Sequence, residues 1–231
     1  MLNELAENVW IVEGECVDFH GFAYPTRSVV IRLKNGDLWI WSPITLTDDL
    51  TQWIDELGSV KHLISPNKLH HLYLTDWHEK YASALLWGPK SIQDKRPDLS
   101  FQQPLAKQSP DAWNDEFELF HVQGSLSMDE ILFLHKPSKT LIMADFSENF
   151  EEEFLKKKWR GWQRWIARRW GIVVGKGHAP LDWRLSFIQR KKLRALKEEL
   201  LCRDIDHVVM AHGQIEVANA RQFLKTSLAW I

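Results

Sequence analysis

Residues 65–77 have the sequence Ser-Pro-Asn-Lys-Leu-His-His-Leu-Tyr-Leu-Thr-Asp-Trp, and they follow residues 60–64, Val-Lys-His-Leu-Ile, which have the length and composition of a buried strand. His70 and His71 therefore lie where this strand gives way to a helix. Ligands of open α/β sheets bind at the carboxyl ends of strands, and imidazole is the commonest metal ligand in proteins. Because neighbouring helical side chains point about 100° apart, both rings can contact one ion only in a turn or at a helix start. The alternative is one core or capping histidine beside a solvated one.

Two further apolar strands end in side chains that can bind a metal. Residues 141–145, Leu-Ile-Met-Ala-Asp, end in Asp145, and residues 208–213, Val-Val-Met-Ala-His-Gly, end in His212 and Gly213. Taken singly, Asp145 is explained equally well as a helix cap, and His212 as a hydrogen-bonded residue at a strand end. Three strands that end in His-His, Asp and His-Gly together supply nitrogen and oxygen ligands that suit zinc or iron.

The composition is that of an ordinary globular protein. The 231 residues are 45% hydrophobic and 26% charged, with a formal net charge of −2, which predicts no general attraction to nucleic acid or membrane. The two cysteines, Cys16 and Cys202, form no CxxC pair and fit a reducing compartment. The first residues lack the features of a signal peptide, and no apolar stretch approaches the roughly 20 residues needed to span a bilayer. We therefore expect a cytoplasmic protein with no transmembrane segment and no specific nucleic-acid partner.

Hydrophobic patterning predicts two groups of strands, each followed by helices, and a final strand and helix that rejoin them. We find no internal repeat and no flexible linker, so residues 1–231 are expected to form one domain with two sheets covered by helices. The expected strands are 8–13, 27–33, 37–42, 60–64, 84–87, 117–122, 130–135, 140–144 and 207–211. The main expected helices are about 47–58, a helix ending near 80, 151–170, 183–202 and 217–230, with a short helix between 89 and 110.

In these three strand ends the chain resembles the metallo-β-lactamase fold superfamily over nearly its whole length. That superfamily has a His-x-His-x-Asp-His turn after a strand, a later strand ending in Gly-Asp, and a last strand ending in a Gly-His-Gly-like turn. Residues 66–71, 144–145 and 211–213 lie at the corresponding places, and the Pro-Asn-Lys-x-His-His segment is similar to that of an uncharacterised branch of the superfamily. The resemblance implies an α+β fold: a four-layer αββα sandwich of two mixed β-sheets with helices on both outer faces.

The resemblance also implies an altered metal site. The first metal position of the superfamily uses two histidines where this chain has Pro66 and Lys68, and its third histidine has only His121 as an irregularly spaced counterpart. The second metal position retains more of the superfamily's ligands. We expect one divalent ion there, preferably zinc and alternatively iron or manganese, bound by His70, His71, Asp145 and His212. We expect Lys68 to serve as a catalytic residue that stabilises negative charge, and to form an ion pair with Asp145 where the first metal is missing.

A basic, tryptophan-rich segment follows the Asp145 strand. Residues 156–197 contain fourteen lysine and arginine residues and a single acid, Asp182. In a helix over 151–170, apolar residues at steps of three and four form one stripe, which would pack on the sheet and leave a solvated basic back. The other reading is a lid or docking surface for an anionic substrate, an acidic partner or a membrane surface. The stripe consists of Leu155, Trp159, Trp162, Ile166 and Trp170.

Two functions remain open at this point. The first is a metal-dependent hydrolase with a degenerate, mononuclear site and a small-molecule substrate, for which an anionic compound is one option. Four protein ligands would, however, close a tetrahedral zinc site and make it structural. The second is a catalytically inactive member of the fold that binds a partner through the basic tryptophan-rich helix. Metal content and an open coordination position distinguish the two.

Overall fold

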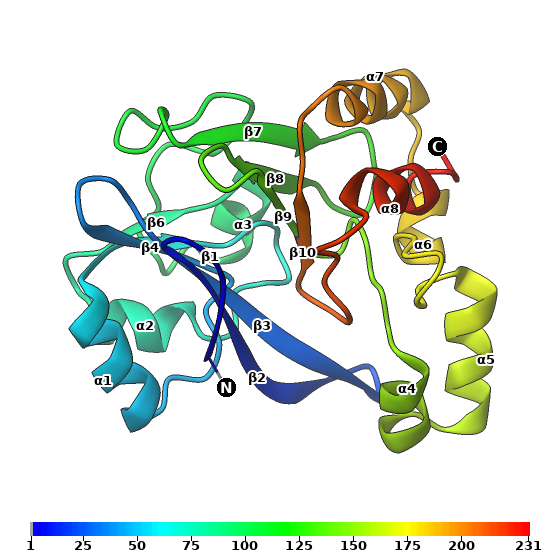
Figure 1. Cartoon of the computed structure of the whole chain (residues 1–231), viewed down its shortest axis with the longest axis horizontal. Helices are drawn as coiled ribbons and strands as arrows, with labels where there is room; N and C mark the ends of the chain where they lie inside the picture. The colour runs from blue at the N-terminus through cyan, green and yellow to red at the C-terminus, as the bar shows by residue number, and fades with distance from the viewer. Residues whose placement is uncertain (1) are drawn as a thin grey trace.

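The structure, a computed structural model, describes residues 2–231, which form two β-sheets. The larger sheet has the strand order β1-β2-β3-β4-β5-β6 (Figure 1). Strands β1 to β4 are antiparallel, whereas β4, β5 and β6 are parallel, so the sheet is mixed. Its strands are β1 (Leu2–Ala6), β2 (Val9–Phe19), β3 (Phe22–Arg32), β4 (Asp37–Trp41), β5 (Ser59–Ile64) and β6 (Leu85–Trp87).

The smaller sheet has the order β10-β9-β8-β7 and is also mixed. Strands β7, β8 and β9 are antiparallel neighbours, and β10 pairs with β9 in parallel. The side chains of β8 alternate, because Ile131 and Phe133 face the other sheet while Leu132 and Leu134 face the helices. The four strands are β7 (Phe117–Val122), β8 (Glu130–His135), β9 (Thr140–Met143) and β10 (His207–Met210).

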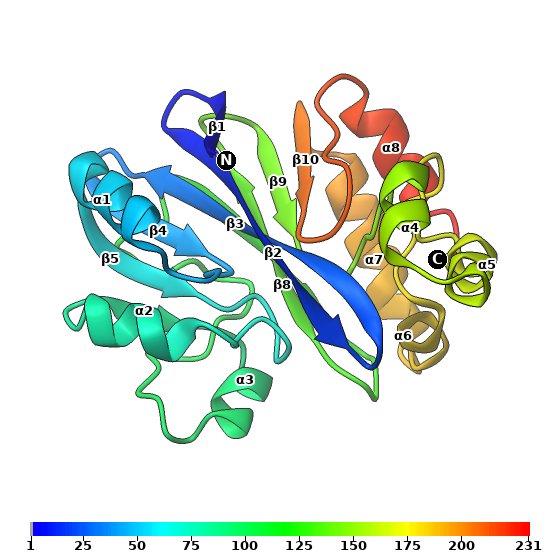
Figure 2. The same cartoon turned by 90° about the horizontal axis from the view of Figure 1, so that it is seen from below.

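Helices cover the outer faces of both sheets (Figure 2). Apolar residues of α1 (Asp48–Leu57) and α2 (Leu74–Lys80) pack on the six-stranded sheet, and α3 (Lys90–Lys95) follows β6. The other sheet is covered by α6 (Leu181–Leu185), α7 (Arg190–Leu201) and α8 (Ala220–Ser227). The molecule is therefore a four-layer αββα sandwich, as the resemblance implied.

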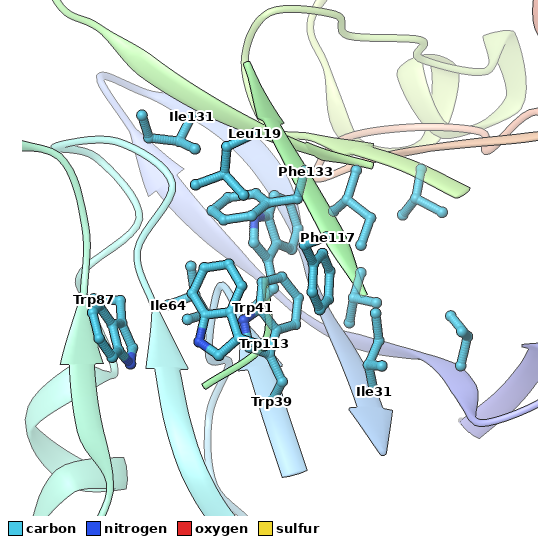
Figure 3. Packing of buried hydrophobic residues seen from close by; sticks show 14 of the residues in the cluster. Ile31, Trp39, Trp41, Ile64, Trp87, Trp113, Phe117, Leu119, Ile131 and Phe133 are labelled. Atoms are coloured by element: carbon cyan, nitrogen blue, oxygen red, sulfur yellow. The ribbon is translucent and has the colours of Figure 1, made fainter. Parts of the chain in front are cut away.

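The layer between the sheets is unusually aromatic. Trp39 stacks on Phe117 with ring centroids 4.5 Å apart, and Trp113 packs edge-on against Trp87 (Figure 3). Tryptophan and phenylalanine bury large apolar areas, so much of the tryptophan content is explained by this core. None of the helices in residues 2–231 combines the length and apolar character that a bilayer-spanning segment needs.

The two long helices expected from the sequence are each broken. Residues 151–170 form α4 (Glu152–Lys158) and α5 (Gly161–Trp170), and residues 183–202 contribute to α6 and α7. The first break occurs at Trp159, whose backbone is extended (φ −111°, ψ 142°) and whose indole nitrogen donates to Ala23 O at 2.8 Å. Gln163 Oε1 then accepts from Arg160 N and starts the new helix. Strand β1 and the outer halves of β2 and β3 were also not anticipated.

Candidate metal centre

Three of the four predicted metal ligands converge in the structure. One ligand atom each from His70, Asp145 and His212 lies within 4.8 Å of the others. His70 Nε2 is 3.4 Å from Asp145 Oδ2, and His212 Nε2 is 3.4 Å from Asp145 Oδ1. Asp145 and His212 are buried and His70 is largely so, which makes this a shielded cluster with the donor types of a metal site.

Parallel strand pairing brings Asp145 and His212 together. Met143 of β9 is the register partner of Met210 of β10, and each ligand follows two residues later. The two strands end side by side, so their next side chains meet at the same edge of the sheet (Figure 1). This is the geometry in which the carboxyl ends of parallel strands form a binding site.

His70 comes from the opposite sheet, in the turn between β5 and α2. Ser65 Oγ donates to the carbonyls of both Asn67 and His70, which holds the turn in a compact form. The imidazole stacks on Trp41, with ring centroids 5.9 Å apart and an interplanar angle of 29°. The centre therefore lies where the two sheets meet.

Both ligand imidazoles have their second nitrogen occupied. His212 Nδ1 lies 2.7 Å from Pro25 O, an acceptor, so this nitrogen donates a hydrogen bond and Nε2 faces Asp145. His70 Nδ1 lies 2.7 Å from Ser42 Oγ, an arrangement that leaves its Nε2 facing Asp145 in the same way. The two 3.4 Å contacts are to different oxygens of Asp145, and one ligand atom from each residue lies within 4.8 Å of the other two, a spacing that one bound ion can bridge. The donors thus fit one divalent ion.

His71, the fourth expected ligand, is not brought into this group. Its Nδ1 lies 3.4 Å from Arg96 Nη1, although His71 also lines the cavity into which the centre opens. Burial, with Lys95 and Arg96 nearby, lowers the pKa of His71 to about 4, so the ring is neutral. Adjacent residues in a turn point in different directions, which explains why one histidine reaches the centre and the next does not.

Lys68 does not form the expected ion pair with Asp145. Its ammonium donates to Ser127 O, and Asn67 contacts the aspartate instead. Asn67 is fully buried: Nδ2 donates to Asp145 Oδ2 at 2.8 Å and to Glu130 Oε2 at 2.9 Å, while Oδ1 accepts from Leu69 N at 2.8 Å. The position in front of Asp145 that we assigned to a cation is therefore filled by a neutral amide.

Glu130 is a buried acid beside the centre that the sequence analysis missed. Its fully buried carboxylate accepts from the backbone N–H groups of Ala144 and Asp145, at 2.8 and 2.9 Å, as well as from Asn67. Burial and the neighbouring Asp145 raise the pKa of Glu130 to about 7. A lone acid at the start of an apolar strand was the available signal, and its role is to fix the backbone that carries Asp145.

His121 lies outside the centre. Its Nε2 is 2.7 Å from Asp129 Oδ2 and its Nδ1 is 2.9 Å from Gln123 Nε2, so both ring nitrogens have other partners. Burial raises the pKa of Asp129 while His121 and Ser91 lower it, and the net shift is downward. This histidine belongs to a separate polar cluster at the β7–β8 end of the sheet.

The three ligands line a cavity of about 480 Å³. Glu148, which is buried, accepts a long hydrogen bond (3.4 Å) from Tyr24 Oη, and the Tyr24 ring packs edge-on against His212 at 4.9 Å. Burial, then Asp145, raises the pKa of Glu148 well above its ordinary value, and burial and Glu148 do the same for Tyr24. The cavity is of the size that accepts a small molecule. Its other lining residues include Lys68, Lys95, Trp159, Ile166, Trp170 and Asp182.

Comparisons with known proteins give a family and a fold. The family described as "Domain of unknown function (DUF4336)" matches residues 6–157. The solved structure of DIM-1 metallo-beta-lactamase has a TM-score of 0.67 and 14% identity, covering 99% of this chain and 96% of that one. VMB-1 gives a TM-score of 0.68 at 11% identity, covering 100% and 95%. A metallo-beta-lactamase from Pontibacter korlensis gives 0.62 at 16%, covering 100% and 97%. No curated protein matches the chain with significant sequence similarity.

These similarities extend over the whole chain, and they establish that it has the metallo-β-lactamase fold. At such low identity they do not extend to activity. Within this fold, the described residues bring together His70, Asp145 and His212, a group with the donor types and spacing of a metal site.

Proposed function

The chain belongs to the family described as Domain of unknown function (DUF4336), and we propose that it is a mononuclear metal-dependent hydrolase with a small-molecule substrate. The observation that supports this is the convergence of one ligand atom each from His70, Asp145 and His212, all of which line a cavity. Three protein ligands leave the fourth tetrahedral position open, which is the arrangement of catalytic rather than structural zinc sites. The objection that four protein ligands would close the site falls away because His71 faces Arg96.

The ion we propose is zinc, and the same two imidazoles and one carboxylate also suit iron or manganese. When bound, such an ion polarises a substrate oxygen and lowers the pKa of water. The protein's part is to hold the ligands: Pro25 O and Ser42 Oγ orient the imidazoles, and Asn67 with Glu130 fixes Asp145. Hydrogen bonds of this kind, to the ligand atoms that do not bind the metal, orient the ligands and affect metal affinity in metal sites generally.

Lys68 is our proposed catalytic residue. Among residues 2–231 its ammonium donates to a neutral carbonyl, Ser127 O, and forms no ion pair, and Lys68 lines the same cavity. There it would stabilise negative charge that develops on the substrate during hydrolysis. We expect Lys68→Ala to leave metal content unchanged and to lower kcat, whereas Lys68→Arg should retain part of the rate.

Elemental analysis tests the proposal directly. Protein purified without added metal, and again after incubation with zinc and dialysis, should contain close to one equivalent, and His212→Ala should contain little. The metal-loaded protein should then hydrolyse at least one member of a panel of esters, thioesters, phosphodiesters and β-lactams, and lose that activity with His212→Ala. Absence of metal after zinc incubation would contradict the proposal.

The second candidate is a non-catalytic binding protein that uses the basic tryptophan-rich segment. It is favoured by the exposure of Trp162 (55%), which does not pack on a sheet as the stripe predicted, and of its neighbour Trp165 (65%). This candidate would be supported if the metal-free protein bound a specific partner through this segment.

A further inference from the structure

Helix α5 presents two tryptophans to solvent on one face. Trp162 and Trp165 are 55% and 65% exposed, while Gln163 and Ala167 of the same helix are buried. At 100° per residue, Trp162, Trp165, Arg168 and Arg169 fall within one exposed arc, opposite the buried pair. Exposed tryptophan is unusual enough to indicate a binding surface when several apolar side chains lie together.

The same surface is strongly basic. Residues 156–170 contain seven lysine and arginine residues and no acid. Within residues 2–231 only Arg168 of these seven has an ion-pair partner, Glu152, at the start of α4. The other six form no ion pair among residues 2–231; Lys156, Lys157, Lys158, Arg160 and Arg169 are exposed, and Arg164 is half-buried.

The surface lies at the rim of the molecule and is held rigidly to it. Both views place α4 and α5 at one edge, outside the sheets (Figures 1 and 2). Trp159 Nε1 donates to Ala23 O and Gln163 Nε2 donates to Gly21 O, so the helix pair is fixed to the β2–β3 turn. Phe22 of that turn packs edge-on against Trp162, with centroids 5.5 Å apart.

We propose that this surface, the exposed face of α5 with the basic end of α4, docks the protein on a membrane surface that carries anionic lipid headgroups. Indole rings partition to the headgroup region, and arginine and lysine reach the phosphates around them. A second copy of the chain is a poor occupant, because its identical basic surface would be repelled. A projecting edge also fits a flat partner better than the groove of another protein would.

Vesicle binding tests the docking without reference to metal or activity, so its outcome is independent of the proposed hydrolase. Full-length protein is sedimented with neutral phosphatidylcholine vesicles and with vesicles containing about a third phosphatidylserine. We expect binding to the anionic vesicles, weakened at high salt, and at least tenfold weaker binding to the neutral ones. Trp162→Ala/Trp165→Ala and Lys157→Ala/Lys158→Ala should each reduce binding by about tenfold.

A matched control comes from α7, which lies far from α4 in Figure 1. Lys191 and Lys192 are also exposed, and Lys191→Ala/Lys192→Ala removes the same charge without touching the proposed surface. It should bind like the unaltered protein. Because the four test residues are exposed, circular dichroism should show unchanged folding. The proposal is overturned if anionic vesicles are not bound, or if the control loses binding as the test variants do. It is also overturned if the unaltered protein is a dimer and the tryptophan variant is a monomer, because the surface would then be a contact between two copies of the chain.

Discussion

The two adjacent histidines of the β5–α2 turn have different surroundings, and this difference can be tested. His70 faces Asp145 and His71 faces Arg96. We expect His70→Ala to lose bound metal and His71→Ala to retain it, measured as metal per protein after zinc loading and dialysis. The pair is its own control, since both variants remove one imidazole from the same turn. Loss of metal in His71→Ala alone would show that the turn rearranges when metal binds.

Asn67 takes the place beside Asp145 that we expected the Lys68 ammonium to occupy, and it contacts the buried carboxylates through two hydrogen bonds. Its amide donates to both buried carboxylates, and Asn67→Ala leaves Asp145 and Glu130 each short of one donor. We expect a loss of about 1–3 kcal/mol in the free energy of unfolding by urea, and a roughly 10–100-fold loss of metal affinity. Asn114→Ala, an exposed asparagine, is the control and should change stability by less than about 0.5 kcal/mol.

The sequence was enough to predict which side chains at the strand ends meet. It was not enough to predict which side chains of the 66–71 turn point into the centre. Asp145 and His212 end apolar strands, and parallel pairing of those strands suffices to bring them together. Inside the 66–71 turn, direction depends on the local hydrogen bonds of Ser65 and Asn67, which no periodicity reports. The roles of Asn67, Lys68 and His71 therefore required the structure, as did that of Glu130, whose partners are backbone groups of another strand.

Helix breaks were missed for a related reason. The 151–170 pattern has the spacing of one helix, but tertiary contacts of Trp159 with Ala23 and Phe22 outweigh the continuation of the helix at this point. The register of the apolar stripe is lost at the break, and Trp162 faces solvent instead of the sheet.

The turn after β10 depends on a glycine. Gly213 has φ +89°, and a Cβ there would lie 2.2 Å from Asn149 O. We expect Gly213→Ala to cost more than about 2 kcal/mol in the free energy of unfolding and to lower metal binding, because the adjacent His212 must shift. Gly175, with φ +90° and nothing within 4 Å of its would-be Cβ, is the matched control. Gly175→Ala should show only the conformational cost of about 1 kcal/mol.

At the scale of the whole molecule, the two sheets share one core. The inner cluster draws residues from both, including Trp39 of β4 and Phe133 of β8, and Trp113 of the segment before β7 packs between them. We propose that residues 1–231 form a single domain, and we expect one cooperative unfolding transition. Tryptophan fluorescence, which reports on the inner core, and far-ultraviolet circular dichroism should give coincident urea curves. Two separated transitions would indicate that the sheets unfold as independent units.

The shared core also contains two histidines, which makes stability depend on pH. Burial lowers the pKa of both His62 and His135 to about 4; Lys34 adds a smaller lowering at His135, while at His62 Asp37 raises the pKa and Lys61 lowers it, both by less than burial does. His62 Nδ1 accepts from Trp87 Nε1 at 3.1 Å, a bond that only the unprotonated nitrogen can make. Each ring is thus neutral in the folded protein and titrates near its ordinary value of 6.5 when the chain unfolds.

Between pH 6.5 and 4 the unfolded chain therefore binds more protons, so stability is complete above about pH 6.5 and falls as the pH is lowered towards 4. The loss is at most about 3 kcal/mol for each histidine. Glu130 acts in the opposite sense, since its raised pKa favours the folded state below 4.5 and this contribution is lost as the pH rises through about 7. His62→Gln keeps an acceptor for Trp87 and removes one titration. The free energy of unfolding by urea should fall less between pH 7 and pH 5 in this variant than in the unaltered protein. Equal losses would mean that the pKa of His62 is not lowered in the folded protein.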